Sequence, residues 1–337
     1  MDVDCAVYVR GVRQQDAVSL AEARAAPLYG GSFVWIDVYE PSSELMNELR
    51  EEFHLHELAV EDVVRAHQRP KVEGYDSFHL VVFKTARLDA ETNRVSFGEL
   101  DILVGPGFVI TVRHGGAHDP GRARARVEAH PELLKTGPAS VVWALLDVVV
   151  DDYGPVVEAI EAEVEEIEQA VFADGRDLTE RVYLAKQQIN EVYRAIHPLL
   201  TPLEAIQRGA FPEMDPALAR YFRDVADHVR RVQDEVTAER EQLVSVLEAN
   251  LSLINVRQNV ITAQQNQIVK QLTIVATVFL PLTFVTGFFG QNFAWLERHI
   301  DSLAMFVLLG LGGLVVPCLL LYAWFRQGGY LKPEGET

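Results

Sequence analysis

Two apolar segments near the C-terminus constrain the fold of this chain more than any other feature of its sequence. No charged residue lies between Gln271 and Leu296, and none lies in residues 304–325. Each segment is long enough for a helix that crosses a hydrocarbon core of about 30 Å. Two adjacent uncharged segments of this length seldom occur in soluble folds. The sequence therefore predicts a membrane protein with two transmembrane helices, at residues 271–290 and 304–325.

The charges that flank these segments predict their orientation. Lys270 precedes the first segment, and Arg326 and Lys332 follow the second, whereas the loop 291–303 has no excess of positive charge. Because cytoplasmic flanks are enriched in Lys and Arg, both termini are expected in the cytoplasm, including the tail 326–337. The acidic N-terminus, which lacks an apolar run typical of a secretory signal, agrees with this orientation in the inner cell membrane.

The residues before the first apolar segment predict one very long helix. From Pro216 onward there is no proline until Pro281 and no glycine until Gly287. At about 1.5 Å per residue, such a helix would be on the order of 100 Å long. A helix of this length does not fit inside a compact domain. Residues 216–270 are therefore expected to form a cytoplasmic stalk that continues into the first transmembrane helix.

The N-terminal part has the mixed pattern of an α/β domain. Residues 1–137 alternate short runs of β-branched and aromatic residues with helix-like segments, and Ser42 or Ser43 could cap a helix over 43–53. The turn signal Gly105-Pro106-Gly107 predicts a hairpin between two strands. Residues 138–215 carry no strand signals and predict a helical hairpin. The fold class is thus an α+β membrane protein with a cytoplasmic α/β domain and a helical stalk.

Composition excludes several classes of function. The formal net charge of −19 argues against a nucleic-acid partner and suits a protein that attracts cations. The chain has only two cysteines, so a disulfide framework is excluded. His54, His56 and His67 show no recognised metal-ligand spacing, and no HExxH motif occurs. We therefore expect neither an enzyme with catalytic residues nor a resident cofactor.

The first transmembrane segment carries a stripe of small and polar residues at near-heptad spacing. Such a stripe is typical of helices that pack around a shared axis. On periodicity alone, a pore and a packed, non-conducting core explain it equally well. The stripe, which also includes two larger apolar residues, consists of Asn266, Val269, Thr273, Ala276, Leu280, Thr283 and Gly287.

Two motifs resemble the CorA family of magnesium transporters. After the first transmembrane segment, residues 279–293 read FLPLTFVTGFFGQNF, in which Gly290-Gln291-Asn292 stands where that family has Gly-Met-Asn. In the soluble part, Glu61-Asp62-Val63 followed by HQRPKVE at 67–73 is similar to the family's signature. The two motifs occur in the right order, and the resemblance covers nearly the whole chain.

The resemblance implies a homopentamer in the lipid bilayer, with five copies of the first transmembrane helix around a pore. It implies that Asn266, Leu280 and Thr283 line this pore, and that Gly290, Gln291 and Asn292 form its filter. The transported and regulatory ion would be Mg²⁺, with Co²⁺, Ni²⁺ or Zn²⁺ as alternatives. Because Gln291 replaces the family's methionine, a zinc transporter similar to the ZntB branch is the second interpretation.

The resemblance also implies an ion sensor in the soluble domain. In the family, carboxylates between neighbouring subunits bind Mg²⁺ and hold the pore closed. Asp89 and Asp224 are the candidates here, although both could be ordinary exposed acids. A membrane-anchored ion sensor or scaffold that conducts no ions is the alternative from another class of function.

Overall fold

The computed structural model describes residues 3–14, 19–25, 31–89, 91, 94–116, 119–173, 178–211, 214–291, 299 and 302–327. These residues form two compact units, Met1–Leu251 and Ser252–Thr337, and the boundary between the units falls within one long helix.

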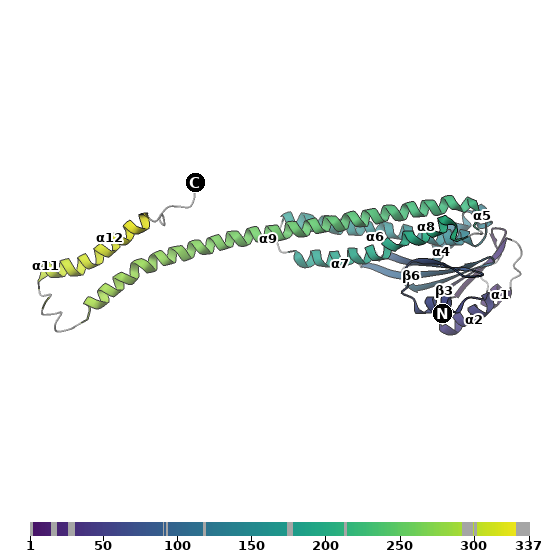
Figure 1. Cartoon of the computed structure of the whole chain (residues 1–337), viewed down its shortest axis with the longest axis horizontal. Helices are drawn as coiled ribbons and strands as arrows, with labels where there is room; N and C mark the ends of the chain where they lie inside the picture. Colours follow the sequence, from purple (N-terminus) through teal and green to yellow (C-terminus); the bar gives the residue numbers. More distant parts are fainter. Residues whose placement is uncertain are drawn as a thin grey trace. The chain divides into compact units, whose positions relative to one another are not determined.

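A mixed seven-stranded sheet lies at the centre of the first unit (Figure 1). Its strand order is β2-β1-β3-β7-β6-β5-β4, and only β3 and β7 pair in parallel. Strands β6 and β7 form the predicted hairpin, in which Gly105 pairs with Phe108. The strands are β1 (Val3–Val9), β2 (Val12–Arg13), β3 (Ser32–Tyr39), β4 (Lys71–Gly74), β5 (His79–Asp89), β6 (Arg94–Gly105) and β7 (Phe108–Gly115).

Helices cover both faces of this sheet (Figure 1). One face packs against the first three helices, α1 (Leu20–Ala25), α2 (Ser43–Phe53) and α3 (Glu57–Arg65). The other face packs against the group that begins with α4 (Pro120–Glu128), α5 (Pro131–Leu134) and α6 (Ala139–Ala173). The predicted α/β domain is confirmed.

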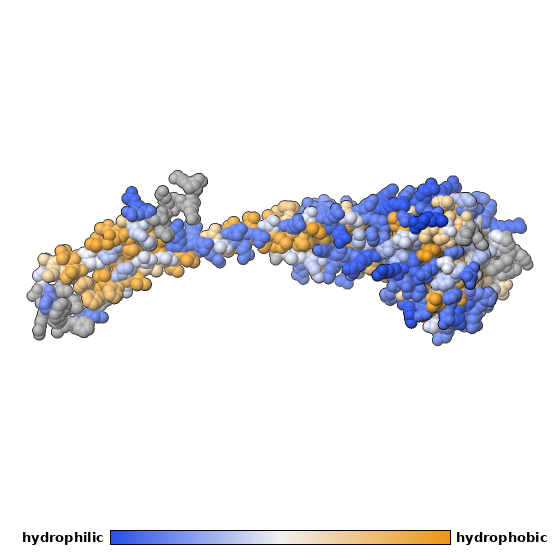
Figure 2. Space-filling view, viewed as in Figure 1, coloured by the Kyte–Doolittle hydropathy of each residue, from blue (hydrophilic) through white to orange (hydrophobic). Residues whose placement is uncertain are grey.

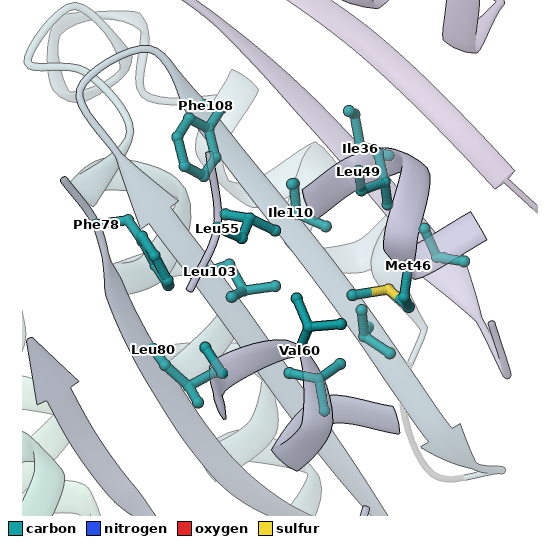
Figure 3. Packing of buried hydrophobic residues seen from close by; sticks show 14 of the residues in the cluster. Ile36, Met46, Leu49, Leu55, Val60, Phe78, Leu80, Leu103, Phe108 and Ile110 are labelled. Carbon is teal, nitrogen blue, oxygen red and sulfur yellow. The ribbon is translucent and has the colours of Figure 1, made fainter. Parts of the chain in front are cut away.

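The core on the first face joins α2 and α3 to the sheet (Figure 3). Helix α2 begins where the Ser42 hydroxyl accepts a hydrogen bond from the Leu45 amide at 3.3 Å, so Ser42 is the cap. Its residues Met46 and Leu49 are fully buried. They lie over inward-facing residues of alternate strand positions, such as Ile36 and Ile110. This core fixes the helices on the sheet by burial of apolar area.

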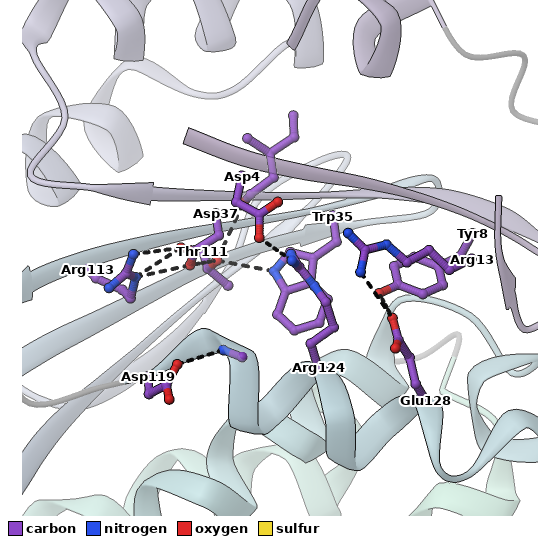
Figure 4. Close-up of polar contacts among 12 residues, drawn as sticks. Asp4, Tyr8, Arg13, Trp35, Asp37, Thr111, Arg113, Asp119, Arg124 and Glu128 are labelled. Atoms are coloured by element: carbon purple, nitrogen blue, oxygen red, sulfur yellow. Dashed lines mark hydrogen bonds and ion pairs between the residues drawn. The ribbon is translucent and has the colours of Figure 1, made fainter. Parts of the chain in front are cut away.

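A polar network links β3 to β7 on the face of the sheet opposite this core (Figure 4). The Thr111 hydroxyl donates to Asp37 Oδ1 at 2.6 Å, and Arg113 Nε donates to Asp37 Oδ2 at 3.0 Å. The Trp35 indole N–H donates to the Thr111 hydroxyl at 3.2 Å. Burial raises the pKa of the Asp37 carboxyl, and the Arg113 guanidinium opposes that rise. The buried acid is therefore well partnered.

The predicted helical hairpin after Pro138 has one undivided and one divided arm. Helix α6 is continuous, whereas the second arm of the hairpin is divided after Ile196. Pro198 and Pro202 carry no amide hydrogen for helical hydrogen bonds, which accounts for the division. The pieces are α7 (Thr179–Ile196), η1 (His197–Leu199), α8 (Leu200–Ala205) and the π-helical η2 (Ile206–Ala210).

The predicted long helix is present. After the short η3 (Pro216–Leu218), helix α9 (Ala219–Phe289) runs for 71 residues with Pro281 inside it. At about 1.5 Å per residue its length is on the order of 100 Å. It belongs to both units, since the boundary falls after Leu251.

The second unit contains the two candidate membrane spans. These are Pro216–Phe289, which begins in the first unit, and Leu303–Gln327. The second span consists of α11 (Leu303–Met305), the π-helical η4 (Phe306–Leu311) and α12 (Gly312–Gln327). Figure 2 shows apolar side chains along both helices of this unit. Within the described part of the chain, two helices are thus long and apolar enough to cross a membrane.

We expect Leu49→Ala to destabilise the soluble domain by about 2–5 kcal/mol, because it leaves a cavity in a fully buried site. The midpoint of thermal unfolding, followed by tryptophan fluorescence, would measure the loss. Leu58→Ala is the matched control, since this leucine is 58% exposed on α3. Equal midpoints for the two variants would contradict the position of α2 in the core.

Candidate ion path and ion-sensing cluster

The predicted pore residues share one face of α9. At about 100° per residue, the positions from Asn266 to Gly287 fall within an arc of about 100°. All seven are exposed in the single chain, including Leu280 at 72% and Val269 at 59%. In one chain nothing within the described residues covers this stripe.

Helix α12 packs on a different face of α9. A Cβ atom on Gly313 would lie 3.5 Å from Cγ1 of Val285, so the glycine permits close approach of the two helices. The partly covered residues of α9 in this region lie about 140° around the helix from the stripe. They are Ile274, Thr277, Val278, Pro281, Leu282 and Val285. The second span therefore leaves the stripe open.

The threonines of the first span return their hydroxyl hydrogens to the helix backbone. Thr273 donates to the Val269 carbonyl at 2.8 Å, and Thr283 donates to the Phe279 carbonyl at 2.8 Å. This satisfies the polar hydrogens where lipid or apolar side chains offer no acceptor. The lone pairs of each hydroxyl oxygen remain available to accept hydrogen bonds from water.

The predicted filter begins at the C-terminal end of α9. The Gly290 amide donates to the Thr286 carbonyl at 2.9 Å, and the Gln291 amide donates to the Phe288 carbonyl at 3.3 Å. A Cβ atom on residue 290 would lie 3.0 Å from the Thr286 carbonyl oxygen, so a glycine suits this close turn. Asn292, the third predicted filter residue, lies outside the described residues.

A cluster of three potential metal ligands lies between α6 and α9. One ligand atom each from Asp147, Asp224 and His228 lie within 4.8 Å of one another. Asp224 and His228 are four residues apart on α9 and so share a face, whereas Asp147 comes from α6. Carboxylate oxygens and an imidazole nitrogen are donors for divalent cations. We name these three residues the α6–α9 cluster.

Asp147 is the most enclosed member of the α6–α9 cluster, with 13% of its side chain exposed. Burial raises the pKa of its carboxyl, and the nearby Arg126 guanidinium opposes that rise. Arg126 forms ion pairs with both Asp147 and Asp151. The electrostatics of the cluster thus depend on α4 as well as on the two helices that supply its ligands.

The two predicted regulatory acids take different positions in one chain. Asp224 belongs to the α6–α9 cluster, while Asp89 ends β5, where its Oδ1 accepts a hydrogen bond from the Glu91 amide at 2.9 Å. Sequence reasoning missed Asp147. Its signal was a single acid within the apolar run 141–150. His228 was visible only as part of the stalk sequence.

Comparison with known proteins gives a consistent result. The family model described as "CorA-like Mg2+ transporter protein" matches residues 30–327. A putative metal ion transporter, YfjQ of Bacillus subtilis, is 30% identical over 302 residues, which cover 89% of this chain and 91% of the relative. The cobalt/magnesium transport protein CorA of Thermotoga maritima is 27% identical over 83% of this chain and 78% of its own length.

A solved structure has a similar fold over the full length. The complete structure of the CorA magnesium transporter from Methanocaldococcus jannaschii superposes with a TM-score of 0.64. The match covers 98% of this chain and 100% of the other, at 20% sequence identity. The likeness includes the soluble domain, the long helix and the C-terminal helix.

Proposed function

The chain belongs to the family of CorA-like Mg²⁺ transporter proteins, and we propose that it is a homopentameric channel for hydrated Mg²⁺. Membership makes it a divalent-cation transporter of the membrane rather than an enzyme. The observation that carries the proposal is the stripe on α9, which α12 leaves open. Five such stripes around a common axis supply a pore and remove the polar face from lipid.

Neutral oxygens in the pore suit a hydrated magnesium ion. Mg²⁺ binds its inner water shell tightly and dehydrates reluctantly. The Thr283 oxygen, whose hydrogen is already donated to the backbone, can accept hydrogen bonds from that shell. A ring of Asn292 carboxamides at the outer mouth would act in the same way. Because these groups are uncharged, they hold the ion weakly enough for release.

The proposed orientation places both termini in the cytoplasm of an inner-membrane protein. The charges that flank the two spans support this orientation. The α6–α9 cluster would then meet cytoplasmic Mg²⁺, and Asp89 of a neighbouring subunit would complete the sensor. Bound ion would favour the closed pore, since a ligand shifts the equilibrium toward the state it binds better.

Zn²⁺ is the second candidate ion, because Gln291 departs from the methionine of the family's motif and the ZntB branch also varies this position. Uptake measured with Mg²⁺, Co²⁺, Ni²⁺ and Zn²⁺ separately would identify the preferred ion. In liposomes, absence of flux for all four ions would favour a non-conducting sensor or scaffold.

The exposed stripe on α9 predicts self-association of the chain. A lone subunit would expose Thr273, Thr283 and the rest of the stripe to lipid, so we expect a homopentamer in mild detergent. Native mass spectrometry of the full chain would measure the stoichiometry. A stable monomer or dimer would argue against the pore.

The proposed filter role of Asn292 makes a different demand from that of Gln291. Asn292→Leu removes the carboxamide but nearly keeps the side-chain size, so the pentamer should survive while flux falls to background. Gln291→Met is the matched control and should keep flux, because the family's motif has an apolar side chain there. Liposome uptake of Mg²⁺ would compare the two variants. Wild-type flux in an assembled Asn292→Leu channel would exclude the filter role.

The proposed sensor depends on the carboxylates of Asp89 and Asp224. We expect Asp89→Ala and Asp224→Ala each to weaken closure of the channel by Mg²⁺, because each removes a negative ligand. Asp227→Ala is the matched control, since Asp227 lies on the same helix but pairs with Arg230 at 2.6 Å. Inhibition of flux by cytoplasmic-side Mg²⁺ would be measured. Unchanged inhibition in both sensor variants would remove these residues from the mechanism.

A further inference from the structure

Arg126 already neutralises part of the α6–α9 cluster. Its Nη1 contacts Asp147 Oδ2, and its Nη2 lies 2.7 Å from Asp151 Oδ2. The Arg126 side chain is 30% exposed and Asp147 is 13% exposed, so water screens this pair only in part. A guanidinium therefore lies on the same carboxylate that faces Asp224 and His228.

A cap at its first turn and contacts with the sheet fix α4, the helix that carries Arg126 (Figure 4). The Asp119 carboxylate caps the helix by accepting a hydrogen bond from the Gly121 amide at 2.9 Å. Arg124 pairs with Asp4 and stacks over the Trp35 ring at 4.8 Å from its centroid. At the end of α4, Glu128 accepts a hydrogen bond from the Tyr8 hydroxyl at 2.8 Å. Helix α4 is thus anchored on the sheet, and Arg126 does not reach the cluster on a free segment.

A divalent cation in the cluster would share Asp147 with this guanidinium. Two like charges on one carboxylate repel each other, and the carboxylate gives less of its charge to the ion. Because Arg126 pairs with Asp147, the net negative charge at the cluster is smaller than that of its two carboxylates alone. The fixed guanidinium should therefore lower the affinity of the cluster for any divalent ion.

We propose that Arg126 sets the divalent-cation affinity of the α6–α9 cluster by acting as a built-in competitor for Asp147. The inference rests on the proposed sensor role of Asp224. A sensor of a transported ion must release that ion when its cytoplasmic concentration falls. Arg126 supplies this release, because it gives Asp147 a positive partner whenever the ion leaves.

The chain provides a matched control on the same helix. Arg122 lies one turn before Arg126 on α4 and pairs with Asp152 of α6, outside the cluster. Arg122→Gln and Arg126→Gln therefore remove the same charge and the same kind of α4–α6 ion pair. The full chain, purified in detergent and stripped with EDTA, would be titrated with MgCl₂ while its unfolding midpoint is recorded. The midpoint rises as the ion binds the folded state.

We expect Arg126→Gln to lower the half-saturating Mg²⁺ concentration about tenfold, and Arg122→Gln to leave it within about twofold of wild type. Similar curves for the two variants would overturn the proposal. If Arg126→Gln does not fold, Arg126→Lys is compared with Arg122→Lys. A lysine cannot bridge Asp147 and Asp151 as the forked guanidinium does, so we expect the half-saturating Mg²⁺ concentration to be a few-fold lower in Arg126→Lys than in Arg122→Lys. Equal concentrations for the two lysine variants would overturn the proposal.

Asp224→Ala distinguishes failure of this inference from failure of the sensor. If the Mg²⁺ response disappears in Asp224→Ala but is the same in the Arg126 and Arg122 variants, the sensor stands and the role of Arg126 is wrong. If the response is unchanged in Asp224→Ala, the ion does not bind this cluster. That result contradicts the sensor and the inference that rests on it.

Discussion

The continuity of α9, which persists through Pro281, is the constraint on which the other features depend. A helix is one of the few structures that satisfies its own amides in lipid, and α9 runs without interruption through 71 residues that begin in the soluble unit. One element therefore carries both Asp224 and the stripe from Asn266 to Gly287. No loop separates the cluster from the first span along the chain.

The side chains of the first span serve two needs on two faces. The face toward α12 uses Val285 opposite Gly313, where small size permits close packing. The stripe carries threonines whose hydrogens go to the preceding turn of the helix. A hydroxyl that is satisfied in this way tolerates lipid during insertion and still offers an acceptor to water in an assembled pore. This accounts for threonine, rather than an apolar residue, at these positions.

Sequence patterns predicted what depends on neighbours along the chain. The absence of glycine and proline before Pro281 predicted α9, and Gly105-Pro106-Gly107 predicted the β6–β7 hairpin. The division after Ile196 was missed, although Pro198 and Pro202 were visible signals. The partnership of Asp147 with Asp224 was not predictable, because it depends on how α6 packs against α9. The filter residue Asn292 stays a prediction, since it lies outside the described residues.

The arginines of α4 neutralise individual carboxylates of a strongly acidic chain. Arg122 and Arg126 pair with acids of α6, whereas Arg124 pairs with Asp4 of β1. All of these pairs attach α4 to its neighbours, and among them the Arg126–Asp147 pair includes a residue of the cluster. The net charge of −19 attracts cations in general but cannot select where they bind. Selection requires that most carboxylates be neutralised by fixed partners while a few keep enough charge to hold an ion that can leave again. Arg126 neutralises Asp147 in part, so that this carboxylate can hold an ion and also release it.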